Sequence, residues 1–106
     1  MAITNPNRGI WDITSTGTYV MIDAKQGKGS WKSMSITNQH ASTAATISLY
    51  LDDGLGGADS QVFIAGPIDI PSGVTLYLEN VSFDNDIYRL YITTAGSGHP
   101  LSIIGR

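Results

Sequence analysis

Residues 44–52, with the sequence Ala-Ala-Thr-Ile-Ser-Leu-Tyr-Leu-Asp, carry the clearest structural signal in the chain. Apolar Ile47, Leu49 and Leu51 alternate with Ser48 and Tyr50. Because successive side chains of a β-strand point to opposite faces, this alternation predicts a half-buried strand. The three aliphatic side chains are expected to point inward, and Ser48 and Tyr50 outward.

Similar segments lie on both sides of this strand, and turn residues such as Pro71-Ser72-Gly73 separate them. No segment has the apolar spacing of an amphipathic helix. We therefore predict an all-β fold, an antiparallel β-sandwich of jelly-roll or Greek-key type with about seven or eight short strands. Gly66-Pro67 predicts an edge strand, a bulge or a break within the fourth of these segments. The expected strands are residues 18–22, 30–38, 44–52, 62–70, 74–79, 88–92 and 101–104.

The 106 residues suffice for one domain. Residues 1–14 are polar, with scattered apolar residues and a turn at Asn5-Pro6-Asn7. We interpret them as an N-terminal arm or a short edge strand that a partner would order. The expected division is an arm at residues 1–14 and a single β-sandwich domain at residues 15–106.

Composition excludes several classes of function. The net charge is −3, and the six Lys and Arg residues do not cluster, so no nucleic-acid partner is expected. No segment approaches the roughly 20 apolar residues of a membrane span, and we expect no signal peptide. There is no cysteine, which fits folding in a reducing cytoplasm. Only 14% of residues are charged, which suits a subunit packed against neighbours, although an ordinary weakly charged β domain is the alternative.

Residues able to do chemistry are sparse. His40 and His99 lie in expected loops without other ligands at metal-binding spacing. Ser97 is two residues from His99, but no Gly-x-Ser-x-Gly motif surrounds it. We therefore expect no catalytic residues, no cofactor and no metal site, and hence no enzyme.

Two acidic turns are weak candidates for calcium. Asp52, Asp53 and Asp59 flank a Gly-rich loop, and Asp84-Asn85-Asp86 forms a second turn. Neither turn has the ligand spacing of a calcium loop. Side chains of Asp and Asn commonly cap their own turns, and this is the preferred interpretation.

Aromatic side chains are the best candidates for contacts. The alternation places the tyrosines of three expected strands opposite the inward leucines. Outward tyrosines suit a protein interface or, as a third option, stacking on sugar rings, and a core that buries both faces of some strands is equally compatible. The candidate interface residues are Ile10, Trp11, Trp31, Tyr50, Tyr77 and Tyr91.

The order of segments from residue 30 to 105 resembles small β-sandwich virion proteins of tailed bacteriophages. The resemblance lies in Ile36-Thr37-Asn38 and the following strand, Ile68 to Leu76 with its Ile-Pro-Ser-Gly-Val-Thr-Leu hairpin, Arg89 to Gly96, and the closing segment Leu101 to Ile104. It implies a structural part of the particle, foremost a capsid decoration (cement) protein. Such proteins bind through whole surfaces, so no functional residue can be transferred.

The expected function is therefore a non-enzymatic virion protein, made in the host cytoplasm, that binds the major capsid protein or other virion proteins. A homo-oligomer is expected, with a trimer favoured. The alternatives are a tail, neck or baseplate component and a carbohydrate-binding module. If residues 2–14 form an arm, their deletion is expected to abolish binding to capsids and leave the fold intact.

Overall fold

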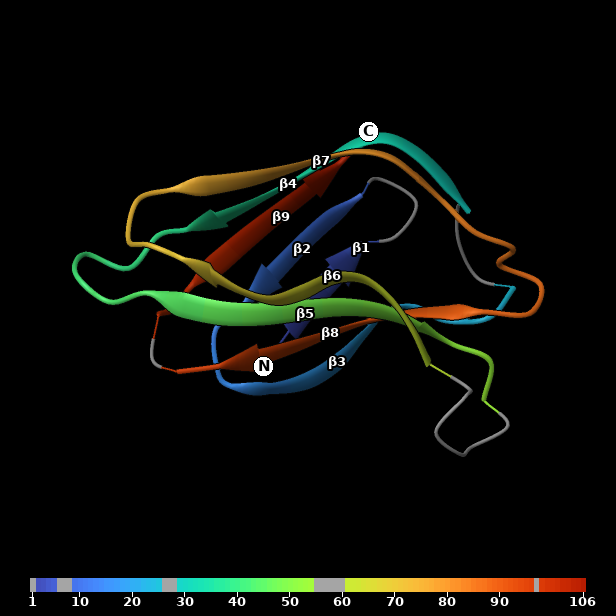
Figure 1. The fold of residues 1–106 in the computed structure, drawn as a ribbon, viewed down its shortest axis with the longest axis horizontal. Helices are drawn as coiled ribbons and strands as arrows, with labels where there is room; N and C mark the ends of the chain where they lie inside the picture. Colours follow the sequence, from blue (N-terminus) through green and yellow to red (C-terminus); the bar gives the residue numbers. More distant parts are fainter. Residues whose placement is uncertain (1, 6–8, 26–28, 55–60, 97) are drawn as a thin grey trace.

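The computed structural model describes residues 2–5, 9–25, 29–54, 61–96 and 98–106. These residues form two antiparallel sheets that pack face to face, and they contain no helix (Figure 1). The strands are β1 (Ala2–Asn5), β2 (Ile10–Ile13), β3 (Gly17–Ile22), β4 (Ser30–Asn38), β5 (Ala45–Asp52), β6 (Gln61–Ile70), β7 (Thr75–Ser82), β8 (Arg89–Ala95) and β9 (Leu101–Gly105).

The pairing of the strands is nested. β5 pairs with β6, β4 with β7, β3 with β8, and β2 with β9, all antiparallel. The chain is thus one long hairpin that is rolled into a five-stranded sheet, β1-β2-β9-β4-β7, and a four-stranded sheet, β3-β8-β5-β6. The predicted antiparallel β-sandwich is therefore confirmed, and of the two expected types, jelly roll and Greek key, the winding is that of a jelly roll.

β1 and β2 differ from the expected arm, because both are strands of the five-stranded sheet. β2 pairs with β9 over Ile10 to Ile13, and the side chains of Trp11 and Ile13 are buried in the core. Successive side chains of a strand point to opposite faces, so Trp11 and Ile13, two residues apart, point to the same face, which is the core face. The expected boundary at residue 14 is therefore wrong, since β2 belongs to the sandwich.

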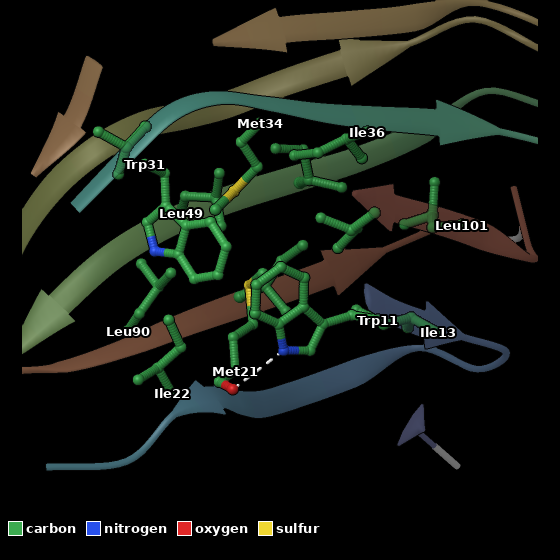
Figure 2. Close-up of a cluster of buried hydrophobic side chains, with 14 of the residues drawn as sticks. Trp11, Ile13, Met21, Ile22, Trp31, Met34, Ile36, Leu49, Leu90 and Leu101 are labelled. Carbon is green, nitrogen blue, oxygen red and sulfur yellow. Dashed lines mark hydrogen bonds between the residues drawn. The ribbon is translucent and has the colours of Figure 1, made fainter. Parts of the chain in front are cut away.

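Two tryptophans lie in the core between the sheets (Figure 2). The rings of Trp11 and Trp31 meet edge to face, with centroids 5.6 Å apart and planes at 65°. The indole Nε1 of Trp11 donates a buried 3.0 Å hydrogen bond to the carbonyl oxygen of Met21 in β3. This bond joins the two sheets and satisfies a polar group that would be costly to bury alone.

Two glycines make room for the indole of Trp31. A Cβ atom at Gly105 would lie 2.7 Å from Cε3 of Trp31, and a Cβ at Gly9 would also collide with the ring. The backbone N–H of Gly105 donates a 2.6 Å hydrogen bond to the carbonyl oxygen of Gly9. Gly9, just before β2, and Gly105, at the end of β9, therefore meet over the ring of Trp31.

The run that contains Gly66-Pro67 is an edge strand, as predicted. β6 forms the edge of the four-stranded sheet, and its register against β5 shifts twice between Ile47 and Tyr50. A Cβ at Gly66 would lie 2.6 Å from Cα of Ser48, so a side chain does not fit there.

Candidate interaction surface

Four apolar side chains form a row across the outer face of the four-stranded sheet. Val20 of β3 is paired with Tyr91 of β8, Tyr91 with Tyr50 of β5, and Tyr50 with Phe63 of β6. Each strand of the sheet thus contributes one residue. We call these four residues the aromatic row.

The rings of the aromatic row pack on one another. Tyr50 and Tyr91 have centroids 5.3 Å apart and planes at 18°, and Tyr50 and Phe63 have centroids 5.3 Å apart and planes at 33°. The rings of Tyr50 and Tyr91 are therefore stacked, and the ring of Phe63 is tilted against that of Tyr50. Tyr50, in the middle, is consequently only 7% exposed although it lies on an outer face, whereas Phe63 at the edge is 54% exposed. The row is a continuous apolar strip and not a set of separate rings.

Polar pairs border the aromatic row on both sides. On one side, the hydroxyl groups of Thr18 and Thr93 are hydrogen-bonded at 3.2 Å. On the other side, Nε of Arg89 donates a 2.9 Å hydrogen bond to Oδ1 of Asp23, which is also the ion pair of this region. An apolar strip between polar residues has the layout of a protein interface, with an apolar centre and a polar rim.

A second exposed row crosses the outer face of the five-stranded sheet. Ile10 of β2 is paired with Ile104 of β9, Ile104 with Ser35 of β4, and Ser35 with Tyr77 of β7. Both isoleucines are exposed, and Tyr77 is 61% exposed. We call these four residues the isoleucine–tyrosine row.

The six candidate contact residues therefore lie in three different places. Tyr50 and Tyr91 belong to the aromatic row, and Ile10 and Tyr77 to the isoleucine–tyrosine row of the opposite face. Trp11 and Trp31 are buried in the core, so the expectation that they are outward contact residues is wrong. The ring of Trp31 fills the space that Gly9 and Gly105 leave, and the ring of Trp11 packs against it between the sheets.

Sequence reasoning missed the polar Ser35 and three apolar members of the two rows, which are Val20, Phe63 and Ile104. Each of these three is an exposed apolar residue in a strand. Alternation alone predicts which face such a residue occupies, but cross-strand neighbours depend on strand order. The signal available in the sequence was the apolar character of Val62-Phe63-Ile64 on a strand with the marks of an edge.

His40 and the two acidic turns serve the local backbone. Nδ1 of His40 accepts hydrogen bonds from the backbone N–H groups of Ser42 and Thr43, at 3.1 and 3.0 Å. Oδ1 of Asp52 accepts from the N–H of Gly54 at 2.7 Å, and Oδ1 of Asp84 from the N–H of Asp86 at 3.0 Å. Both acidic turns are thus capped by their own carboxylates. Asp59 and Ser97 lie outside the described residues.

His99 differs from His40, because its Nε2 atom is buried and has no hydrogen-bond partner among the described residues. Within the ranges that the structure describes, there is no pocket, and no group of three or more His, Cys, Asp and Glu side chains is placed to hold a metal ion. In the same ranges, no helix is long and apolar enough to cross a membrane.

Comparisons with known proteins assign no family to the chain. No family model and no curated protein matches the chain. Among solved structures, the Anabaena sensory rhodopsin transducer is similar over 100% of this chain and 99% of its own, with a TM-score of 0.45 and 15% sequence identity. A likeness of this degree assigns neither a family nor a function.

Proposed function

We propose that the chain is a non-enzymatic structural subunit of a bacteriophage particle, most specifically a capsid decoration (cement) protein. The observation that carries the proposal is the aromatic row, a continuous apolar strip on an outer sheet face with polar borders. Its partner would be the major capsid protein or another virion protein. The chain would be made in the host cytoplasm and end in the virion.

The aromatic row supports binding because the apolar side chains at its two ends, Val20 and Phe63, are exposed on a sheet face. Contiguous exposed apolar surface that polar residues surround marks sites of association. Tyr and Phe are enriched in the centres of interfaces, where they bury much area and lose little side-chain entropy. The low proportion of charged residues, 14%, favours a surface that meets other proteins.

The assignment to a virion rests on the sequence resemblance over residues 30 to 105. The fold agrees with it, since jelly rolls occur in viral capsid proteins, but they also occur in lectins. The fold alone therefore does not distinguish a virion protein from a lectin. A tail, neck or baseplate component has the same physical features and differs only in its partner.

A carbohydrate-binding module is the second candidate, because three aromatic rings share one sheet face. The packing of the rings counts against it. A sugar stacks on the free face of a ring, and the ring of Tyr50 is covered by Tyr91 and Phe63. Phe63, at the sheet edge, is the most accessible ring of the row.

Co-sedimentation tests the proposal. The purified chain is mixed with expanded, undecorated heads of a phage that encodes it, and the pelleted protein is quantified. The variants Phe63→Ser and Val20→Ser change the two ends of the aromatic row. Ile87→Ser is the matched control, because Ile87 is 52% exposed, close to the 54% of Phe63, but lies in the turn before β8, outside the row.

We expect saturable binding to heads that weakens by about tenfold or more in Phe63→Ser and Val20→Ser, the scale of losing an important interface side chain, and that is unchanged in Ile87→Ser. Binding to purified tails in place of heads would support the tail alternative. A glycan-array signal without particle binding would support the carbohydrate module. Equal head binding by all variants would reject the aromatic row as the contact surface.

A further inference from the structure

The free edges of the two sheets differ in how well they could accept another strand. The edges are β1, β7, β3 and β6. β1 has four residues, β3 has a register shift after Val20, and β6 has two register shifts and contains Pro67. Short, bulged or proline-containing edges resist pairing.

β7 lacks these features over its first half. Its register with β4 does not shift from Thr75 to Ser82, and the stretch from Thr75 to Glu79 ends at Asn80, which has a positive φ of 58°. Figure 1 shows β7 at the margin of the five-stranded sheet. A regular five-residue stretch of open edge is therefore exposed there.

Two backbone hydrogen bonds tell which groups of β7 face outward. The N–H of Asn38 donates to the carbonyl oxygen of Val74, 3.1 Å away, whereas the N–H of Gln39, on the other side of β4, donates to Pro100 of the β9 side at 2.9 Å. Antiparallel pairing alternates from residue to residue. Hence the backbone N–H and C=O groups of Leu76 and Leu78 bond to β4, and those of the residues next to them in the strand point away from β4. These outward groups are the N–H and C=O of Thr75, Tyr77 and Glu79.

The stretch is complementary to itself. In an antiparallel pair with a two-fold axis at Tyr77, each Tyr77 faces the Tyr77 of the other copy, Leu76 faces Leu78, and Thr75 faces Glu79. Every outward N–H and C=O then meets a carbonyl or N–H of the other copy. The pairs are aromatic with aromatic, aliphatic with aliphatic, and hydroxyl with carboxylate, and no like charges are opposed.

We propose that β7 pairs antiparallel with β7 of a second copy of this chain, about a two-fold axis at Tyr77. The two five-stranded sheets become one continuous sheet, and the isoleucine–tyrosine rows of the two copies meet at their Tyr77 ends. The contact is isologous, so it gives dimers in place of the trimer that the sequence favoured. The proposal adds a self-contact to the proposed function without depending on capsid binding, so either can fail alone.

Cysteine cross-linking tests the register, since the native chain has no cysteine. Tyr77→Cys places two thiols at directly opposed positions, where the Cα separation of about 5.5 Å permits a disulfide. Thr75→Cys is the matched control, because the two copies of residue 75 lie about 13 Å apart along the paired strands. A mixture of Thr75→Cys and Glu79→Cys chains should cross-link to each other, because these positions face one another.

We expect Tyr77→Cys to form a disulfide-linked dimer at least about tenfold faster than Thr75→Cys, because the dimer holds the thiols at high effective concentration. Light scattering should give a dimer for the wild type. The same measurement should give a monomer for Tyr77→Pro, which removes an outward N–H but no bond to β4, and circular dichroism would verify that this variant is folded. A monomeric wild type, a trimer, equal cross-linking of Tyr77→Cys and Thr75→Cys, or a folded Tyr77→Pro variant that remains dimeric would overturn the proposal.

Discussion

The side-chain amide of Asn38, at the end of β4, donates a 2.9 Å hydrogen bond to the carbonyl oxygen of Ile70, at the end of β6 in the opposite sheet. The same amide nitrogen donates to the carbonyl of Thr43 at 2.8 Å, and Oδ1 accepts from the N–H of His40 at 2.9 Å. The backbone carbonyl of Asn38 also accepts from the N–H of Gly73 at 2.8 Å. One fully buried side chain thus ties the turn after β4 to the turn before β7.

Replacing Asn38 should therefore damage the whole fold. We expect Asn38→Ala to lower the free energy of unfolding by about 2–4 kcal/mol, because each buried polar group left without a partner costs about 1–3 kcal/mol. Asn38→Asp should cost at least as much, since it sets a carboxylate oxygen against two carbonyl oxygens. Urea denaturation measures both, and Gln39→Ala, at the exposed neighbouring position, is the control. A loss in Asn38→Ala no larger than in Gln39→Ala would contradict this role.

The closure over Trp31 gives a second prediction. Gly105→Ala should lower the free energy of unfolding by about 1–3 kcal/mol, the usual cost of overpacking, because its Cβ would press on the Trp31 ring. In the Trp31→Phe background, the smaller ring should reduce this cost, so the two substitutions should not add. A double-mutant cycle followed by urea denaturation measures the coupling, with Ser102→Ala on the same strand as the control. Additive effects of the two substitutions would argue against the contact.

Much of the fold could be predicted because period two and turn residues are local signals. The strands observed at β4, β5, β7 and β8 lie within a few residues of the predicted segments, and Tyr77 and Tyr91 lie on the outer faces that the alternation assigned to them. Because these signals are local, they do not predict which strands lie side by side. That Tyr91 stacks on Tyr50 depends on β8 lying beside β5, and strand order cannot be read from alternation.

The error at Trp11 and Trp31 has the same origin. Both residues are aromatic in a polar or weakly patterned context, so alternation does not assign them to a face. The burial of Trp31 depends on Gly9 and Gly105, which come from opposite ends of the chain and meet only in the folded molecule, and Trp11 packs against Trp31. The exposed edge of β7 also follows from the strand order, because β4 lies on one side of β7 and no described strand of the sheet lies on the other.

The third prediction concerns the deletion of residues 2–14. Because β2 is part of the sheet, this deletion is no longer expected to leave the fold intact. Deleting residues 2–14 should abolish cooperative folding and not merely binding. The deletion removes the buried side chains of Trp11 and Ile13, and losses of this kind cost about 3–5 and 2–5 kcal/mol, against a total stability of about 5–15 kcal/mol for a domain. Thermal unfolding followed by circular dichroism measures the effect. Deletion of residues 2–5, which form an edge strand paired only with β2, is the comparison and should cost less.

The aromatic row should divide into a residue that stabilises the fold and a residue free to bind. Tyr50 is packed between two rings and is nearly buried, so Tyr50→Ala should lower the free energy of unfolding by about 2–4 kcal/mol, close to the cost of truncating a buried aromatic side chain. Phe63 is more than half exposed at the sheet edge, so Phe63→Ala should cost about 1 kcal/mol or less. Urea denaturation of both variants, with Ile87→Ala as the exposed control, measures the difference. If Phe63→Ala were as destabilising as Tyr50→Ala, the row would be an outer layer of the core, and a loss of partner binding in Phe63 variants could no longer be attributed to a lost contact.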